Sequence, residues 1–502
     1  MSDSTAGYVS TQSETILAEH TRLEAGALGL PGAIMQGVAL IAPAVAALFF
    51  VPFVVSLAGQ NAPLAYPIGF VITLALGWVL VQYARKMPSA GGYFTYNSRA
   101  LHPWAGWLST WAFTFYVPLV GGPITAYFGF ILHGVLSDRY GWNVPWWIAP
   151  IVMLPLISAI AFRGIKVSQE VLVFFGILEF LIVLSLGING LVDPGKGGFS
   201  FSPFDPSHIG EAGITWSSFG LAAIFAVQAY TGWDGAAPLA EETADPKRNV
   251  PRAVLWSIVI LGLFLIVVNW GVIVGWGITD ISKLPSSDVL PGLVLAERFW
   301  GGGWPILLVA FFSSVMAVSL ACNNVSTRMW YKAGAIGAFP KPFGHVHARF
   351  RTPDVAIAFQ FLLNIFSGLI LGFAYGPDLI FFFLTGLTLV LGVIFVYVLA
   401  NVGVFFYYRR EHPSEFSWFS HLLVPLGATA ALGYLLYKSF TPFPASPYKY
   451  SPLIVGLWIL GGIAILAYTR YRGRESWLLR AGEAVADIEE EADREALPVP
   501  GV

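Results

Sequence analysis

An acidic side chain stands inside one of the apolar stretches of this sequence. Residues 225–254 read FAVQAYTGWDGAAPLAEETADPKRNVPRAV, where Gly232 and Asp234 interrupt an apolar segment that ends in paired acids, prolines and bases. A carboxylate within a membrane-spanning segment is costly and is by default a candidate for ion or substrate binding. We therefore expect Asp234 to take part in binding a coupling ion.

A second acid, Glu179, lies in FFGILEFLIVL with apolar residues on both sides. It could carry a proton, hold Na⁺, or attract the second amine of a diamine. Without such a role, it would accept a hydrogen bond from a neighbouring helix backbone. Ser313, Ser314 and Ser319 are candidate partners for the coupling ion, although serines in membrane helices usually bond their own backbone.

The composition places these acids in a membrane protein. Of the 502 residues, 56% are hydrophobic and 11% are charged, and the mean hydropathy is +0.69; soluble domains carry about 25% charged residues. The apolar runs are about 20 residues long, which predicts membrane helices and not barrel strands. The single cysteine, Cys322, excludes an intrachain disulfide. The net charge of −2 gives no indication of a nucleic-acid partner.

Hydropathy predicts an all-α integral membrane protein with twelve spans. They lie near 33–57, 62–82, 104–133, 145–162, 168–192, 216–240, 252–276, 303–326, 354–374, 378–407, 419–437 and 451–471. With the N-terminus inside, the inner segments hold 21 Lys and Arg residues and the outer loops hold 6. This bias predicts a plasma (inner) membrane protein whose two ends are cytoplasmic: an N-terminal segment, 1–32, and a charged tail, 473–502.

Two of the predicted spans look broken. The span at 33–57 has Pro43 in its interior, and proline both lacks an N–H group and clashes with the preceding helical turn. The span at 216–240 contains Gly232, Gly235 and Pro238. Broken helices in corresponding halves of a chain indicate a transport site at the membrane midplane, although single prolines and glycines are also ordinary in membrane helices.

A broken helix exposes backbone groups that can hold a small ligand. The N-terminal end of a half-helix suits a carboxylate, and unwound carbonyls suit an ammonium group or a cation. At the first break we expect the donors to be the N–H groups of Ala44, Val45 and Ala46. The candidate substrate-binding residues are those at the two breaks: Ala42, Pro43, Ala44, Val45, Ala46, Gln228, Ala229, Tyr230, Thr231, Gly232 and Trp233.

Several motifs resemble those of the amino acid–polyamine–organocation (APC) superfamily. The clearest is GWDGAAPLAEETADPKRNVPRAV at 232–254, which is similar to the sixth span of that family and the loop that follows it. The segments MPSAGGYFTYNSRALHPWAGWLSTW at 87–111, RGIKVSQEVLVFFGILE at 163–179 and NNVSTRMWYKAGAIGAFPKPFGHVHARFRTPDVAI at 323–357 agree with it. The resemblance covers roughly residues 28–474.

This resemblance implies a 5+5 inverted repeat, with repeats at 33–192 and 216–407 and two further helices at 419–471. It implies alternating access, in which spans 1, 2, 6 and 7 rock as a bundle. It also places Trp233 as an aromatic gate over the substrate, with ordinary packing as the alternative. The family's usual Gly-Ser-Gly at the first break is replaced by residues 42–44, and Glu179 stands where many relatives have a lysine.

Near the cytoplasmic end of the second broken span, the chain carries Glu241 and Glu242, followed by Lys247 and Arg248. We expect these four side chains to form a salt-bridge cluster that closes the inner gate. His345 and His347 belong to a basic loop without acid or cysteine ligands nearby, so we expect no metal site. The sequence indicates no catalytic residues and no cofactor.

Together these features predict a secondary active transporter that imports a small amino acid or organic amine, with proton coupling favoured over Na⁺. A polyamine carrier or an amino acid exchanger is the alternative, which residues 42–44 and the two buried acids motivate. A membrane-embedded enzyme or a channel is a third class, for which the sequence carries no acid–base or metal cluster. The expected partners are the small-molecule substrate, the coupling ion and the lipid bilayer; the oligomeric state stays open.

Overall fold

The computed structural model describes residues 23–211, 213–286, 290–441, 446–473 and 481. Most of the predicted N-terminal segment and nearly all of the predicted tail therefore lie outside the described residues. Within those ranges the chain is helical and forms no strand; its only β-type contacts are isolated bridges, such as Leu28 with Thr243.

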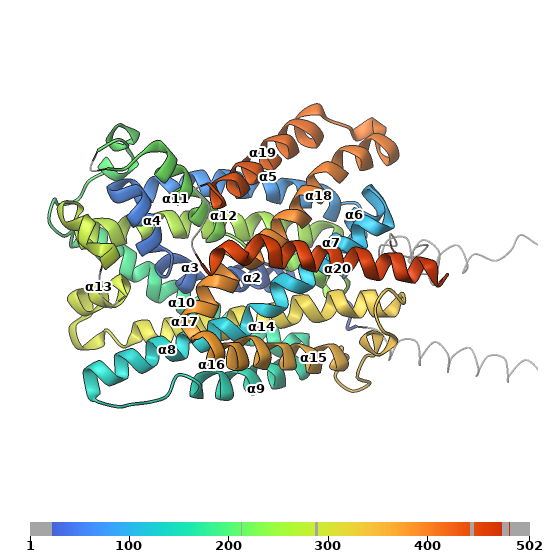
Figure 1. The fold of residues 1–502 in the computed structure, drawn as a ribbon, viewed down its shortest axis with the longest axis horizontal. Helices are drawn as coiled ribbons and strands as arrows, with labels where there is room; N and C mark the ends of the chain where they lie inside the picture. Colours follow the sequence, from blue (N-terminus) through green and yellow to red (C-terminus); the bar gives the residue numbers. More distant parts are fainter. Residues whose placement is uncertain (1–22, 212, 287–289, 442–445, 474–480, 482–502) are drawn as a thin grey trace, which may run out of the picture.

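The helices run mostly along the long axis of the body (Figure 1). The long ones are α5 (Ala62–Ala84), α7 (Pro103–Tyr116), α8 (Gly121–Tyr140), α9 (Ile148–Phe162), α10 (Ile165–Val192), α12 (Pro246–Trp276), α14 (Ile306–Ala335), α18 (Leu389–Glu411), α19 (Val424–Ser439) and α20 (Ser451–Tyr471). The shorter ones include α2 (Leu30–Ile41), α3 (Pro43–Leu48), α4 (Val51–Ala58), α6 (Tyr93–Ala100), α11 (Trp216–Gln228), the 3₁₀ segment η5 (Trp233–Glu242), α13 (Pro291–Trp300), α15 (Asp354–Ile365), α16 (Leu371–Tyr375) and α17 (Pro377–Ile380). Because α13 and α6 lie at opposite ends in Figure 1, we call these the α13 end and the α6 end.

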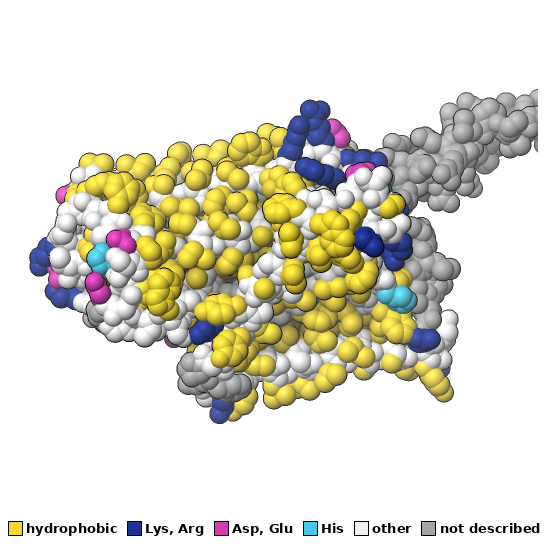
Figure 2. Space-filling view, turned by 90° about the horizontal axis from the view of Figure 1, so that it is seen from above, with side chains coloured by type: hydrophobic (Ala, Val, Ile, Leu, Met, Phe, Trp, Pro, Cys, Tyr) yellow, Lys and Arg dark blue, Asp and Glu magenta, His cyan; other side chains and the backbone are white. Residues whose placement is uncertain are grey.

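The surface suits a lipid environment. Hydrophobic side chains cover much of the face seen in Figure 2, and charged side chains gather mainly towards the two ends. Many large apolar side chains are exposed, for example Phe174, Leu181 and Leu362. A contiguous apolar surface of this extent is unusual for a soluble monomer and marks a surface that contacts lipid.

Helical elements cover all twelve predicted ranges, and the all-helical membrane fold is confirmed. Nine helical stretches among the described residues are long and apolar enough to cross a membrane. Three helices in the predicted spans fall short of this measure, because α2 is 12, α11 is 13 and α9 is 15 residues long, and α3 and α4 are counted in one stretch with α5, Pro43–Ala84. The count of twelve spans therefore stays a prediction.

Helices α10 and α12 approach so closely that backbone meets backbone. A Cβ atom added to Gly271 of α12 would collide with the carbonyl of Gly187 on α10, and one added to Gly190 would collide with the carbonyl of Gly271. Small residues at helix interfaces permit this approach in membranes, where van der Waals contact drives association. The contact fixes α10, which carries Glu179, against α12.

Replacing Gly271 with alanine should therefore destabilise the protein. The added methyl group cannot avoid the α10 backbone, and overpacking of this kind costs about 1–3 kcal/mol. We expect a lower apparent melting temperature of the purified protein in detergent. The control is Gly456→Ala on α20, where a Cβ meets nothing within 4 Å. An equal response of the two variants would contradict the proposed contact.

Candidate functional site

The first break lies at the position that the sequence predicts. Helix α2 ends at Ile41, Ala42 takes a left-handed conformation with φ 57° and ψ 73°, and α3 begins at Pro43. Proline explains the break, because its ring disfavours the α conformation for the residue before it and removes a helical N–H group. The left-handed turn redirects the chain and interrupts the helix between α2 and α3.

The second break is confirmed at residues 229–232. Helix α11 ends at Gln228, two single turns follow, and Gly232 has a φ of 125°, which favours glycine. Beyond it the chain continues as the 3₁₀ segment η5 and not as an α-helix.

The two breaks touch each other. A Cβ atom on Gly232 would lie 2.8 Å from the carbonyl carbon and oxygen of Leu40 and 3.0 Å from the nitrogen of Ile41. Only glycine allows η5 to approach the end of α2 this closely. The predicted site residue Gly232 therefore lies against the last residues of α2, directly before the first break.

The side chains predicted around the second break have different surroundings. Gln228 donates to the carbonyl of Thr385 at 2.9 Å, and buried Tyr230 donates to the carbonyl of Tyr66 at 3.2 Å, so both bind neighbouring helices. Trp233 is buried, and its ring lies 5.5 Å from that of Tyr397. Its role as a gate stays a prediction. A narrow pocket opens beside these residues; its polar lining consists of Thr73, Gln228, Thr231, Trp233 and Tyr397.

Glu179 reaches the first break directly. Its Oε2 accepts a hydrogen bond of 3.0 Å from the backbone N–H of Ala44, in the first turn of α3, and its side chain has no exposure. This is the backbone contact that the sequence left as the alternative to an ionic role. Its other oxygen, Oε1, forms no hydrogen bond within the described chain. The carboxylate thus caps the break with one oxygen and keeps the other available.

Asp234 occupies an aromatic pocket at the start of η5. Tyr397 of α18 donates to its Oδ2 at 3.3 Å, and Tyr93 and Tyr116 are close enough to interact with its charge. The residue is 2% exposed, and its Oδ1 forms no hydrogen bond within the described chain. A carboxylate surrounded by aromatic rings is a favourable environment for an organic cation.

The candidate serines separate into two kinds. Ser313 donates to the carbonyl of Val309 in its own helix at 2.8 Å, which is the ordinary behaviour of a membrane serine. Ser314 is buried next to Glu179, and its hydroxyl forms no hydrogen bond of normal geometry there. Of the serines predicted for a coupling ion, Ser314 is therefore the one that stands beside Glu179.

The predicted pairing of the cytoplasmic charges is wrong. Glu242 binds Arg328 of α14 through two hydrogen bonds, of 2.9 and 3.2 Å, and both side chains are fully buried. Glu241 binds Lys332 of the same helix at 3.3 Å.

Lys247 and Arg248 instead line a surface pocket with Arg85 and Arg252. They extend outward from the first turn of α12, whereas η5 directs the two acids towards α14. The spacing of Arg328 and Lys332, four residues apart on one helix face, is the signal that sequence analysis missed.

A buried amide network on the α6 side of the first break was also missed. Gln36 of α2 donates to the carbonyl of Ala321 at 3.0 Å and accepts from Gln169 of α10 at 2.7 Å. Asn324 of α14 donates to both Gln36 and Ser168, at 3.3 and 2.8 Å. These polar side chains, in otherwise apolar spans, join α2 to α10 and α14.

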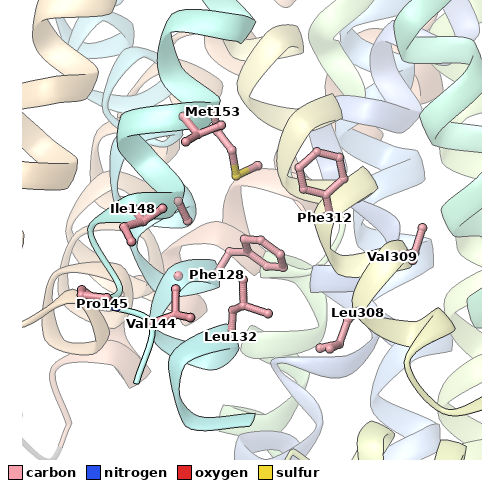
Figure 3. A pocket seen from close by; sticks show the side chains of 12 residues that line it. Phe128, Leu132, Val144, Pro145, Ile148, Met153, Leu308, Val309 and Phe312 are labelled. Carbon is pink, nitrogen blue, oxygen red and sulfur yellow. The ribbon is translucent and has the colours of Figure 1, made fainter. Parts of the chain in front are cut away.

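A larger cavity of about 390 Å³ lies elsewhere, between α8, α9 and α14 (Figure 3). The residues labelled there, such as Phe128, Met153 and Phe312, are all apolar, and none belongs to either break. A transport site for a polar solute needs several converging polar groups. This cavity is therefore not the candidate site.

Comparison with known proteins agrees with this geometry. The family described as "Amino acid permease" matches residues 28–465, so the chain belongs to the amino acid permease family. The resemblance to the APC superfamily is thereby confirmed, and the chain is a membrane transport protein.

Three relatives illustrate the range of the family. The low-affinity putrescine importer PlaP of Escherichia coli K12 is 24% identical over 418 residues, which are 81% of this chain and 87% of PlaP. The serine/threonine exchanger SteT of Bacillus subtilis is 26% identical over 61% of this chain and 68% of SteT. The branched-chain amino acid permease BcaP of Lactococcus lactis is 25% identical over 80% of this chain and 85% of BcaP.

The geometry of Ala42 generates a first prediction for this site. Because a left-handed conformation costs a non-glycine residue roughly 1–2 kcal/mol, Ala42→Gly should raise the apparent melting temperature. The matched control is Ala47→Gly in the middle of α3, which should lower it, because glycine costs a helix interior about 0.5–1 kcal/mol. Shifts of the same sign in both variants would contradict the strained turn.

The buried ion pair Glu242–Arg328 leads to a second prediction for this site. Arg328→Met should destabilise the protein by about 3–5 kcal/mol, because it leaves Glu242 charged and buried without a partner. The double variant Arg328→Met/Glu242→Gln should recover much of this loss, and Lys332→Met, whose partner Glu241 is partly exposed, should cost less. Thermal unfolding of the wild-type protein, both single variants Arg328→Met and Glu242→Gln, the double variant and Lys332→Met tests the coupling; strictly additive effects of the two single substitutions in the double variant would refute it.

Proposed function

We propose that this permease is a secondary active transporter that moves a small amino acid or organic amine across the plasma membrane by alternating access, coupled to protons. The observation that supports this proposal is the contact between the two helix breaks, with Glu179 and Asp234 beside them. Each of these buried carboxylates keeps one oxygen without a hydrogen bond in the described chain. Broken helices and intramembrane carboxylates are the features on which transporters of this architecture rely.

The layout that we propose follows the sequence. Twelve spans form two inverted repeats of five, 33–192 and 216–407, with 419–471 outside them and both termini in the cytoplasm. The bias of Lys and Arg towards one side supports this orientation. The α6 end then faces the cytoplasm.

In the described conformation, the α6 side of the site is held closed by polar contacts. The Glu242–Arg328 pair ties η5 to α14, and the amide network of Gln36 ties α2 to α10 and α14. Opening towards the cytoplasm would break both sets of contacts together. The cytoplasmic gate that we propose therefore consists of Gln36, Glu242 and Arg328, with the pair Glu241–Lys332 at its rim.

Proton coupling is assigned to Glu179. In the described conformation its carboxylate binds the first turn of α3, so a change in its protonation alters the strength of a contact that crosses the break. Its immediate polar neighbours are the Ala44 N–H group and Ser314. Asp234, which Tyr93, Tyr116 and Tyr397 surround, is the second candidate.

A specific observation favours the alternative of an amine carrier or exchanger. Both buried carboxylates are negative or protonatable groups, and neither forms an ion pair with a Lys or Arg among the described residues. PlaP is named as a putrescine importer and SteT as an exchanger, so relatives of both kinds exist. Exchange without a pH gradient would distinguish an exchanger from a proton symporter.

Replacement of Glu179 by Gln should abolish accumulation driven by a pH gradient while leaving exchange intact. Glutamine keeps the shape and can still accept the Ala44 hydrogen bond, but it carries no titratable proton. The measurement is uptake of radiolabelled substrate into proteoliposomes with an inward proton gradient, alongside counterflow at equal pH on both sides.

The matched control is Glu170→Gln, which lies on the same helix but is exposed and distant from the break. Gradient-driven accumulation by Glu179→Gln at the wild-type level would exclude Glu179 as the proton carrier and direct attention to Asp234.

A further inference from the structure

The N-terminal end of α3 already holds a carboxylate, and it belongs to the protein. The first break was expected to offer the N–H groups of three residues to a ligand. Ala44 donates instead to Glu179 at 3.0 Å, and Ala46 donates to the carbonyl of Ala42 at 2.8 Å. Two of the three predicted donors are therefore used inside the protein.

This arrangement differs from a simple helix cap. Glu179 comes from α10, 135 positions away in the sequence, and it is completely buried. Its second oxygen has no hydrogen bond of normal geometry within the described chain, although the buried hydroxyl of Ser314 stands beside the carboxylate, in surroundings where an unpaired carboxylate oxygen is costly. A side chain that served only to cap α3 would gain most by pairing both oxygens.

Charge near the two breaks is one-sided. Glu179 and Asp234 form no ion pair with a Lys or Arg among the described residues; their hydrogen-bond partners are the Ala44 N–H group and the Tyr397 hydroxyl. The nearest buried cations of the inner gate, Arg328 and Lys332, are bound to Glu242 and Glu241. A ligand with its own carboxylate would meet two acidic side chains and no free cation.

A ligand that carries only ammonium groups would be attracted by the same two acidic side chains. Asp234 has a free oxygen in a pocket built by Tyr93, Tyr397 and Trp233, whose rings lie 5.5–5.7 Å apart in neighbouring pairs. Aromatic faces and a carboxylate together recognise an organic cation. The two acids could each receive one end of a diamine, or one acid could receive a monoamine.

We propose that Glu179 determines specificity by occupying the Ala44 N–H group at the first break with the protein's own carboxylate, so that the site selects amines that lack a carboxylate over α-amino acids. This inference rests on the proposed function, because it specifies the substrate class of the same transport site. It makes Glu179 a specificity residue as well as a candidate coupling residue.

The test compares ligands that differ only by the carboxylate. Suitable pairs are putrescine with ornithine, cadaverine with lysine, and ethylamine with alanine. Binding to the full-length protein in nanodiscs is measured by isothermal titration and by thermal stabilisation, since a ligand that binds the folded state raises its melting temperature. For the wild-type protein we expect at least one amine to bind about tenfold or more tightly than its carboxylated partner, because like charges across a site are strongly disfavoured.

The variant Glu179→Ala then tests the cause. It releases the Ala44 N–H group and removes one negative charge, so the preference for the amine should shrink to within about threefold. Glu170→Ala on the same helix should keep the wild-type ratio. Glu179→Gln, which can still accept the Ala44 hydrogen bond, should fall between the two and serves as the folded substitute if Glu179→Ala is unstable.

The outcomes separate this inference from the proposed function. If the carboxylated member of each pair binds the wild-type protein as well as the amine, the specificity role is overturned, although the transport function stands. If the amine preference is present but unchanged in both Glu179 variants, the role of Glu179 is likewise overturned. If neither amines nor amino acids bind or enter proteoliposomes, the proposed function itself fails.

Discussion

Backbone groups freed by a helix break inside an apolar body must find partners within the protein, because lipid offers none. At the first break, Ala42 and Pro43 interrupt the helix, and Glu179 of α10 supplies an acceptor for the N–H group of Ala44. At the second break, the N–H groups of Ala229, Tyr230 and Thr231 donate to carbonyls at the end of α11, and the chain continues as the 3₁₀ segment η5. The packing of the other helices keeps the two breaks in contact.

Glycine residues maintain the contact between the breaks, because they let neighbouring backbones approach closely. Gly232 lets η5 rest on the last residues of α2, and the glycines of α10 and α12 let those helices meet along their backbones. Tight interfaces of this kind resist gradual deformation and favour rigid-body movement. These contacts join η5 to α2 and α10 to α12, and the hydrogen bond between Glu179 and Ala44 joins α10 to the broken first span.

The sequence was informative where a residue type acts on its own chain. Pro43 and Gly232 locate the breaks because their backbone preferences are local. Acids in apolar runs are conspicuous because placing a charged side chain in a membrane costs free energy. Partners across the fold were harder to predict. The pairing of Glu242 with Arg328 depends on how η5 turns towards α14; the spacing of Arg328 and Lys332 indicates a basic face on α14 but does not identify the acids that bind it. The tyrosines around Asp234 come from α6, α7 and α18, and an aromatic residue in a membrane helix carries no signal of its own.

The same geometry links binding to movement. Glu179 belongs to α10, Ala44 to the broken first span, and Asp234 to the segment that follows the second break. If the broken spans rock against α10, the hydrogen bond between Glu179 and Ala44 must stretch or break, since its two ends lie on different moving parts. The free energy of that bond then contributes to the difference between the two conformations, and any ligand or proton that competes for Glu179 biases their populations. One carboxylate placed at the boundary would thus influence both which ligand is accepted and when the transporter changes state.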